Sequence, residues 1–291
     1  MDAAEEAAIH ADLDRALDAG HAVLAAGGSA LDAAHAAVVV LEETPRFNAG
    51  KGAVYTAEGG HELDASLMDG RDRRAGAVAG VTTIRNPITL ARAVMEESAH
   101  VMLVGAGAER FADTLAHIER VGNDWFDTPT RREQLDQEQK AADDADQAAG
   151  ALRGRYFGTV GAVALDQQGH IASATSTGGM TNKRFGRVGD SPLIGAGTWA
   201  DENCGVSGTG WGEFFIRNAV AHDIAARVRY RGDGIVEAAN HVLLEVVAGQ
   251  GGDGGAIALD RHGNIAMPFS TAGMYRGWIG VDGARGTAIF R

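Results

Sequence analysis

The sequence is poor in cysteine, proline, aromatic residues and basic charge. Its 291 residues include one cysteine, Cys204, and five prolines, and aromatic residues make up 6%. A single cysteine excludes an internal disulfide framework and is typical of a reducing compartment. The 39 acidic residues outnumber the 26 basic ones, giving a formal net charge of −13. With no basic stripe to neutralise phosphates, binding to nucleic acid or to an anionic membrane surface is disfavoured.

Long apolar runs are also missing. No stretch approaches the length needed to span a bilayer, and the start, Met1-Asp2-Ala3-Ala4-Glu5-Glu6, lacks the basic residues of a signal peptide. We therefore expect a cytoplasmic protein without membrane contacts. Hydrophobic residues make up 45% of the chain, which is ample for a core.

Hydrophobic periodicity and turn residues predict an α+β fold. Helices are expected first, strands in the middle and helices again towards the end, which favours two packed sheets between helix layers. The expected helices are 3–26, 30–43, 87–99, 108–120, 214–230 and 235–247. The expected strands are 53–56, 61–68, 75–81, 101–104, 159–166, 170–176 and 204–207.

A change of composition at Thr159 marks the centre of the chain. Residues of about 127–158 form an acidic segment with few large apolar side chains, which predicts a mobile linker. Thr159 then opens a buried strand. Cleavage between Gly158 and Thr159 would place a hydroxyl and an α-amine on one residue, the pairing that activates a threonine nucleophile. An α-amine with a pKa of about 7.7–8.0 is able to act as a base near neutral pH.

Two segments of the sequence are similar to each other. GAVALDQQGHIASATSTGGM at 161–180 resembles GAIALDRHGNIAMPFSTAGM at 255–274. Each predicts a strand, a tight turn at Gly169 or Gly263, and a second strand. We therefore expect two equivalent hairpins in a pair of sheets.

Several motifs, taken in order, closely resemble the plant-type asparaginase and isoaspartyl peptidase family of N-terminal nucleophile hydrolases. They are Phe47-Asn48-Ala49-Gly50, Gly158-Thr159-Val160-Gly161, Ser176-Thr177-Gly178-Gly179-Met180-Thr181-Asn182-Lys183, Gly186-Arg187-Val188-Gly189-Asp190-Ser191-Pro192-Leu193, Ser207-Gly208-Thr209-Gly210-Trp211-Gly212-Glu213 and Gly273-Met274-Tyr275-Arg276. The resemblance implies a four-layer αββα sandwich. It also implies self-cleavage into an alpha subunit (1–158) and a beta subunit (159–291), which form one globular domain and pair as an (αβ)2 homodimer.

The same resemblance implies hydrolysis of β-aspartyl peptides and L-asparagine to L-aspartate, through an acyl-enzyme on Thr159 and without a catalytic cofactor. Thr177 would orient the nucleophile, and Asn48 would assist self-cleavage. The Thr209 hydroxyl and the Gly210 N–H would stabilise the oxyanion. The implied substrate-binding residues are Arg187, Val188, Gly189, Asp190, Thr209, Gly210, Trp211 and Gly212.

An amino-acid substrate carries a carboxylate and an ammonium group at a fixed separation. Arg187 would bind the carboxylate and Asp190 the ammonium group. The family also holds a structural sodium ion, and backbone carbonyls suit such a hard cation. Mapped onto this sequence, the carbonyls are those of Leu41, Glu42, Thr44, Phe47, Ala49 and Lys51.

Two features depart from the family pattern. The family begins with a buried strand and a His-Gly-Gly loop, whereas this sequence begins at its first predicted helix, so we expect an exposed sheet edge. Trp211 stands between two glycines where close relatives tend to carry a small residue. An indole there would narrow or reshape the pocket, which leaves the substrate preference open.

Other functions stay open or fit less well. A glycosylasparaginase, or an inactive and unprocessed binding protein of the same fold, are the alternatives. Residues 101–107 imitate a dinucleotide-binding loop, but Arg110 occupies the position of its third glycine. The ten histidines show no metal-binding spacing, and Cys204 fits a small buried strand residue.

Overall fold

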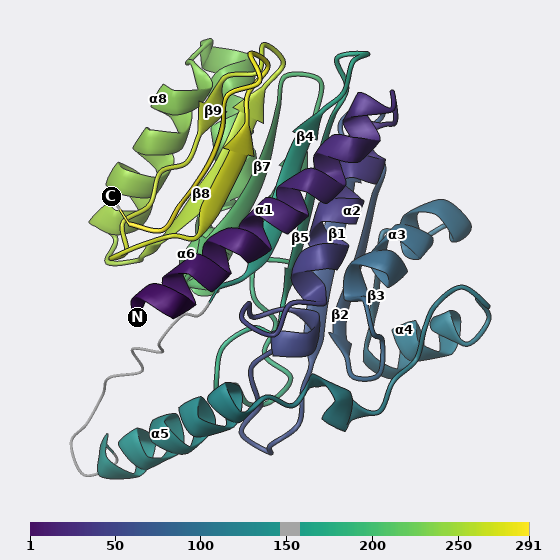
Figure 1. The fold of residues 1–291 in the computed structure, drawn as a ribbon, viewed down its shortest axis with the longest axis vertical. Coiled ribbons are helices and arrows are strands. Elements are labelled where there is room, and N and C mark those ends of the chain that lie inside the picture. Colours follow the sequence, from purple (N-terminus) through teal and green to yellow (C-terminus); the bar gives the residue numbers. More distant parts are fainter. Residues whose placement is uncertain (146–157, 291) are drawn as a thin grey trace.

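The computed structural model describes residues 1–145 and 158–290 (Figure 1). Two capped helices open the chain: Asp2 caps α1 (Ala3–Ala25) and Ser29 caps α2 (Ala30–Glu42), each side chain accepting from an amide of the first turn. α3 (Pro87–Glu97) has a proline in its first turn, where the missing N–H costs nothing. These three helices bury their apolar faces in one hydrophobic cluster with the first sheet.

The first sheet has five strands in the order β3-β2-β1-β5-β4. They are β1 (Leu63–Asp69), β2 (Ala75–Val81), β3 (Met102–Val104), β4 (Val160–Leu165) and β5 (Ile171–Thr177). All neighbours are antiparallel except β2 and β3. Val160 pairs with Ser176, so Thr159 lies opposite Thr177. Among the described strands β4 pairs only with β5 and β3 only with β2, so these two strands form the edges of the sheet.

The second sheet is antiparallel, in the order β6-β7-β8-β9. Its strands are β6 (Thr198–Ala200), β7 (Cys204–Gly210), β8 (Gly254–Asp260) and β9 (Ile265–Ala266). Helices on this side are α6 (Gly212–Asn218), α7 (Val220–Ala226) and α8 (Ile235–Asn240), with π-helical segments at Arg227–Arg231 and His241–Val247. Their apolar residues and those of the sheet form a second cluster.

The two sheets contact each other through small polar side chains. Ser173 donates to the carbonyl of Val206 at 2.7 Å, and the hydroxyls of Thr175 and Ser207 lie 2.8 Å apart. A ribbon of β10 (Arg276–Ile279) and β11 (Arg285–Ala288) lies beside α1. In Figure 1 the second sheet, with α8 on its outer side, lies next to the first sheet and its purple helices.

The two similar segments do form equivalent hairpins, β4–β5 in one sheet and β8–β9 in the other. Asp166 and Asp260 open the two turns, and each carboxylate accepts two backbone amides of its own turn. Gly169 and Gly263 have φ values of 82° and 79°, a left-handed conformation that suits glycine. The turn chemistry therefore accounts for the most similar part of the two segments.

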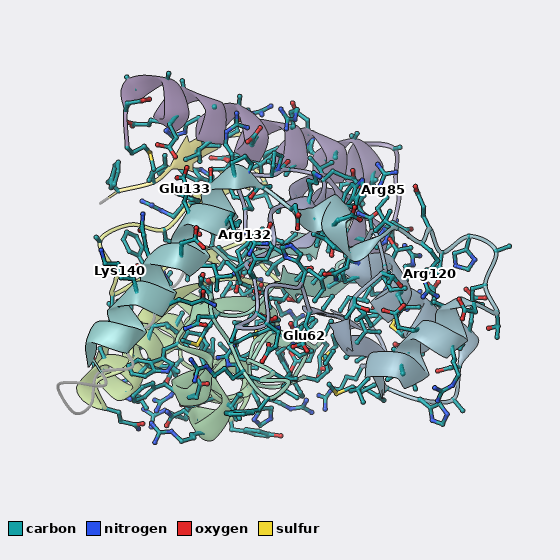
Figure 2. The ribbon with its side chains drawn as sticks, turned by 90° about the horizontal axis from the view of Figure 1, so that it is seen from below. Glu62, Arg85, Arg120, Arg132, Glu133 and Lys140 are labelled. Atoms are coloured by element: carbon teal, nitrogen blue, oxygen red, sulfur yellow. The ribbon has the colours of Figure 1, made fainter. Side chains whose placement is uncertain are left out.

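The prediction of a mobile linker from residue 127 is wrong for its first half. α5 (Pro129–Ala145) is a helix that lies across the underside of the molecule (Figure 2). Arg132, Glu133 and Lys140 are exposed along it, whereas Leu135 is buried. Arg131, also buried, donates to the carbonyls of Gly52 and Arg46 at 2.7 and 3.1 Å. One buried face with i,i+4 spacing is enough to dock a helix of polar composition. The remainder of the predicted linker, 146–157, lies outside the described residues.

Three further predictions need correction. Residues 53–56 are not a strand: a 3-10 turn (Gly50–Gly52) precedes them, and only Thr56 forms a bridge, with Lys183. The helix expected at 108–120 is α4 (Gly105–Ala112), followed by a loop and a 3-10 turn (Asn123–Phe126). The helix expected at 214–230 is interrupted at Ala219, whose φ of 45° is left-handed. Tertiary contacts decide each of these boundaries, which residue patterns alone leave uncertain.

None of the helices in the described ranges 1–145 and 158–290 has the length and apolar character of a membrane span.

Candidate active site

Thr159 and Thr177 share a hydrogen bond at the end of the central hairpin. Thr159 Oγ1 donates to Thr177 Oγ1 at 3.0 Å, and the Gly179 N–H donates to the same oxygen at 3.0 Å. Thr177 is buried and Thr159 is half-buried. The amide fixes the lone pairs of the Thr177 hydroxyl, so that this hydroxyl orients Thr159. The structure thus brings together the two threonines that the sequence analysis paired.

Asn48 links three segments around the Gly158–Thr159 bond. Its backbone N–H donates to the Gly158 carbonyl at 3.0 Å, and its own carbonyl accepts from Gly178 at 3.1 Å. Its side chain donates to the Gly179 carbonyl at 2.7 Å and accepts from the Val54 N–H at 3.0 Å. Each of these backbone and side-chain groups of Asn48 therefore has a hydrogen-bond partner, although the residue is only 1% exposed. A Cβ on Gly178 would lie 2.6 Å from Asn48 Oδ1, so this approach requires glycine.

A small pocket collects most of the predicted residues. It is lined by Asn48, Gly158, Thr159, Thr177, Arg187, Gly189, Asp190, Thr209 and Gly210, together with Gly179, Met180 and Ser191. Val188, Trp211 and Gly212 are not part of its lining. Gly212 lies directly behind it, because a Cβ there would be 2.8 Å from both Arg187 Nη2 and Asp190 Oδ1.

Asp190 is a buried carboxyl group beside a cation. Burial raises its pKa to about 7, and the positive charge of Arg187 opposes that rise. Arg187 itself forms a bidentate ion pair with Glu213, from Nε to Oε1 at 3.0 Å and from Nη2 to Oε2 at 2.9 Å. Glu213 was not among the residues predicted to form the site. Its position two residues after Trp211, in the first turn of a helix that follows β7, is the feature of the sequence that could have pointed to it.

Thr209 and Gly210 end β7 in the same pocket as Thr159. Gly210 has a φ of 143°, and a Cβ there would lie 2.5 Å from the Asp253 carbonyl oxygen. Glycine at this position therefore lets the end of β7 pass close to the backbone at Asp253 and Gly254. A threonine hydroxyl and a backbone N–H on one strand end are suitable donors for an oxyanion.

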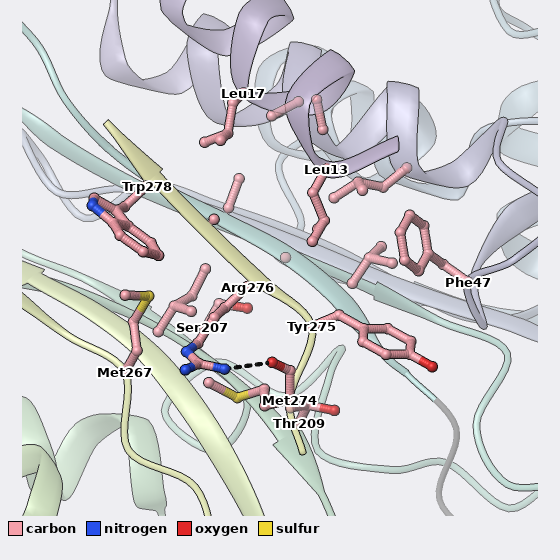
Figure 3. Close-up of a pocket in the computed structure, with 18 of the residues that line it drawn as sticks. Leu13, Leu17, Phe47, Ser207, Thr209, Met267, Met274, Tyr275, Arg276 and Trp278 are labelled. Atoms are coloured by element: carbon pink, nitrogen blue, oxygen red, sulfur yellow. Dashed lines mark hydrogen bonds between the residues drawn. The ribbon is translucent and has the colours of Figure 1, made fainter. Parts of the chain in front are cut away.

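A larger cavity of about 1130 Å³ adjoins the small pocket (Figure 3). It lies between α1, β4, β8 and the chain from 273 to 281, and Leu13, Leu17, Met267 and Trp278 are among its apolar side chains. Gly158, Thr159, Thr209 and Gly210 line both spaces. Thr159 therefore lies where a polar pocket meets an apolar cavity.

The last turn of α2 and the loop after it contain the six carbonyls expected to bind sodium. Two glycines allow this loop to fold tightly: a Cβ on Gly50 would lie 2.4 Å from the Glu42 carbonyl oxygen, and one on Gly52 would lie 2.1 Å from that of Phe47. Lys51 is turned towards Trp125, with its Nζ 4.7 Å from the ring centroid. Within the described residues no group of three or more His, Cys, Asp or Glu side chains could hold a metal ion.

The side chain of Glu42 lies next to β5, the strand that ends at Thr177. It is fully buried, and burial raises its pKa to about 8. Oε1 accepts from Ser176 Oγ at 2.6 Å and from the Ile88 N–H at 3.0 Å. Ser176 directly precedes Thr177, so a buried carboxyl group is bonded to the strand end that contacts Thr159.

Comparison with known proteins gives consistent matches over nearly the whole chain. Residues 1–289 match the family model described as Asparaginase. The chain is 50% identical over 282 residues to the isoaspartyl peptidase of Salmonella typhimurium, covering 96% of this chain and 90% of that protein. It is 51% identical to the isoaspartyl peptidase of Escherichia coli, with 96% and 88% covered. It is 40% identical to the probable isoaspartyl peptidase/L-asparaginase 2 of Arabidopsis thaliana, with 96% and 91% covered.

Proposed function

This chain belongs to the asparaginase family, and from that membership we propose that it is an isoaspartyl peptidase and L-asparaginase, releasing L-aspartate from β-aspartyl peptides and from asparagine. One observation carries the proposal. Directly after Gly158, the Thr159 hydroxyl is hydrogen-bonded to Thr177 in a pocket that also contains Arg187 and Asp190. A nucleophile and the two charges that an aspartyl group requires are thus gathered in one place.

Self-cleavage would expose the nucleophile. Thr159 Oγ1 adds to the Gly158 carbonyl carbon, and the Asn48 N–H, already bonded to that carbonyl oxygen, stabilises the developing oxyanion. The C–N bond to Thr159 breaks, and the hydroxyl proton passes to the released nitrogen. Water then hydrolyses the resulting ester, which leaves a carboxylate on Gly158 and a free α-amine on Thr159.

The free α-amine would act as the base in turnover. It takes the proton from Thr159 Oγ1 as the oxygen attacks the side-chain carbonyl of the substrate. The Thr209 hydroxyl and the Gly210 N–H stabilise the oxyanion, and the leaving ammonia or peptide amine takes up the proton. Water hydrolyses the acyl-enzyme to L-aspartate. Arg187 binds the substrate carboxylate and Asp190 its ammonium group.

The proposed architecture is the four-layer αββα sandwich, with subunits 1–158 and 159–291 paired as a cytoplasmic (αβ)2 homodimer. Helix packing on both sheets, and the contact between the sheets, support the layers. A structural sodium ion on the carbonyls of the 41–51 loop belongs to the same proposal, supported by the tight approach at Gly50 and Gly52. The ion would fix this loop beside Asn48 and take no part in the reaction.

The test is the intact mass of the purified chain after incubation near neutral pH, next to a Thr159→Ala control. We expect fragments 1–158 and 159–291 from the wild type only, together with ammonia release from asparagine and cleavage of a β-aspartyl dipeptide. A wild type that stays uncut and inactive would contradict the proposal and favour an unprocessed binding protein. Faster cleavage of a glycosylated asparagine than of either substrate would favour a glycosylasparaginase.

A further inference from the structure

The guanidinium group of Arg187 is held by a carboxylate outside the small pocket. Nε and Nη2 donate to the two oxygens of Glu213 at 3.0 and 2.9 Å, the parallel geometry that gives the most directional arginine pairing. The Arg187 side chain is 19% exposed and that of Glu213 is 47% exposed, so the guanidinium group is partly shielded from water while its partner faces solvent. Glu213 lies in the first turn of α6, three residues after Gly210. The junction between β7 and α6 thus carries both the proposed oxyanion donors, at the end of β7, and the residue that holds Arg187, at the start of α6.

Three glycines surround the same guanidinium group. A Cβ on Gly189 would lie 2.8 Å from Nη1, one on Gly212 would lie 2.8 Å from Nη2, and one on Gly179 would lie 3.6 Å from Nη1. Gly179 and Gly189 line the small pocket with Thr159. Within residues 1–145 and 158–290, Nη1 has no hydrogen-bond partner. Nη1 is therefore the nitrogen that faces the pocket and is available to a ligand.

Trp211 supports Glu213 from the other side. Its side chain is one of the groups that lower the pKa of the Glu213 carboxyl group, and its ring packs edge-on against Phe214, with centroids 5.0 Å apart. Its backbone N–H donates to the Asp253 carbonyl at 3.0 Å, which fixes the start of the helix. Partial burial alone would raise the pKa of Glu213, but the hydrogen bonds and charge of Arg187 outweigh it and lower that pKa. Glu213 is therefore an anion at neutral pH.

We propose that Glu213, oriented by Trp211, is a positioning residue for substrate binding: it occupies Nε and Nη2 of Arg187 and so presents Nη1 alone to the substrate carboxylate. This inference rests on the proposed function. Without Glu213 the guanidinium group would be free to turn to Asp190, the buried carboxylate of the same pocket. An Arg187–Asp190 pair would occupy both groups that the substrate needs. Glu213 thus keeps the two substrate-binding charges apart.

The experiment compares kcat and KM for asparagine in the wild type, Glu213→Ala, Glu213→Gln and Trp211→Phe, with L-aspartate affinity measured by calorimetry. Loss of a charge-assisted contact predicts a KM about tenfold or more higher for Glu213→Ala, with kcat within about threefold of the wild type. Glu213→Gln keeps one acceptor oxygen and should lie between the two. Trp211→Phe removes the indole N–H together with part of the ring, and should raise KM by about twofold to fivefold.

Glu202→Gln is the matched control. Glu202 also pairs with arginines, Arg73 and Arg229, but at the opposite end of β7 from Thr209. The KM of Glu202→Gln for asparagine should equal that of the wild type. Self-cleavage should be unchanged in the Glu213 variants, because Glu213 does not contact Gly158 or Thr159.

The results separate the two proposals. An unchanged or lower KM in Glu213→Ala, with an active wild type, would overturn the positioning role alone. A fall in kcat as large as the rise in KM, together with a lower thermal midpoint, would show a structural role instead. That result would also overturn the positioning role. A wild type that neither turns over asparagine nor binds L-aspartate would overturn the proposed function, and this inference with it.

Discussion

The backbone N–H of Asn48 donates a 3.0 Å hydrogen bond to the carbonyl oxygen of Gly158. The two residues are far apart in sequence, yet this bond places a donor on the peptide that Thr159 would attack. The Asn48 side chain fixes the donor by bonding Val54 and Gly179. The fold thus holds a hydrogen-bond donor on the carbonyl group of the peptide bond at which cleavage is proposed.

Replacing Asn48 by alanine should slow self-cleavage. The N–H remains in Asn48→Ala, but the two side-chain bonds that aim it are lost. Removing one oxyanion donor costs about 10²–10³ in rate, and a misdirected donor should cost at least about tenfold. Time-resolved intact mass measures the rate, with Asn240→Ala on α8 as a distant control. Cleavage of Asn48→Ala at the wild-type rate would contradict this role.

Thr209→Ala should cleave itself normally but turn over poorly. The Thr209 hydroxyl is proposed to stabilise the oxyanion formed from the substrate, whereas the Asn48 N–H serves the Gly158 carbonyl. We expect kcat to fall by about 10²–10³, with recovery in Thr209→Ser, which restores the hydroxyl. Ammonia release and intact mass, measured on the same samples, distinguish the two steps. Loss of cleavage together with turnover would assign Thr209 to both.

L-aspartate binding should weaken as the pH falls through about 7. Burial raises the pKa of Asp190 to about 7, so the carboxylate that pairs with the ligand ammonium is lost below that pH. The dissociation constant should rise by up to about tenfold per pH unit below 7. Calorimetry between pH 5 and 8 measures it without involving the α-amine base in catalysis. Asp190→Asn should bind weakly at every pH, and a flat profile in the wild type would rule out this assignment.

The stability of the protein should fall as the pH rises from about 4.5 to 8. Burial raises the pKa of Glu42 to about 8 in the folded state, from an ordinary value of 4.5 for an exposed glutamate. Across this window the unfolded chain has lost a proton that the folded chain keeps, so rising pH favours unfolding. One such group contributes a slope of up to about 1.4 kcal/mol per pH unit. Glu42→Gln, which keeps the acceptor oxygen, should flatten the curve in urea unfolding, and an unchanged slope would exclude Glu42 as its source.

Buried positions within mostly polar helices were the hardest feature to predict from the sequence. The docking of α5 depends on Arg131 and Leu135 among polar neighbours, and composition averaged over the segment conceals two buried positions. Glu213 was overlooked for a related reason. A glutamate in the first turn of a helix commonly stabilises the helix through its dipole. Only the position of Arg187 in the folded chain shows that Glu213 also holds this guanidinium group.

The sequence by itself determined the hairpin turns and the two capped helices at the start, because these depend on neighbours in the chain. Asp166, Gly169 and Ser29 act on backbone groups a few residues away. Only the tertiary structure decided which distant groups meet: the Asn48 amide with Gly158, and Glu213 with Arg187. Such contacts join segments whose separation along the chain carries no local signal, and packing of the two sheets fixes their distances.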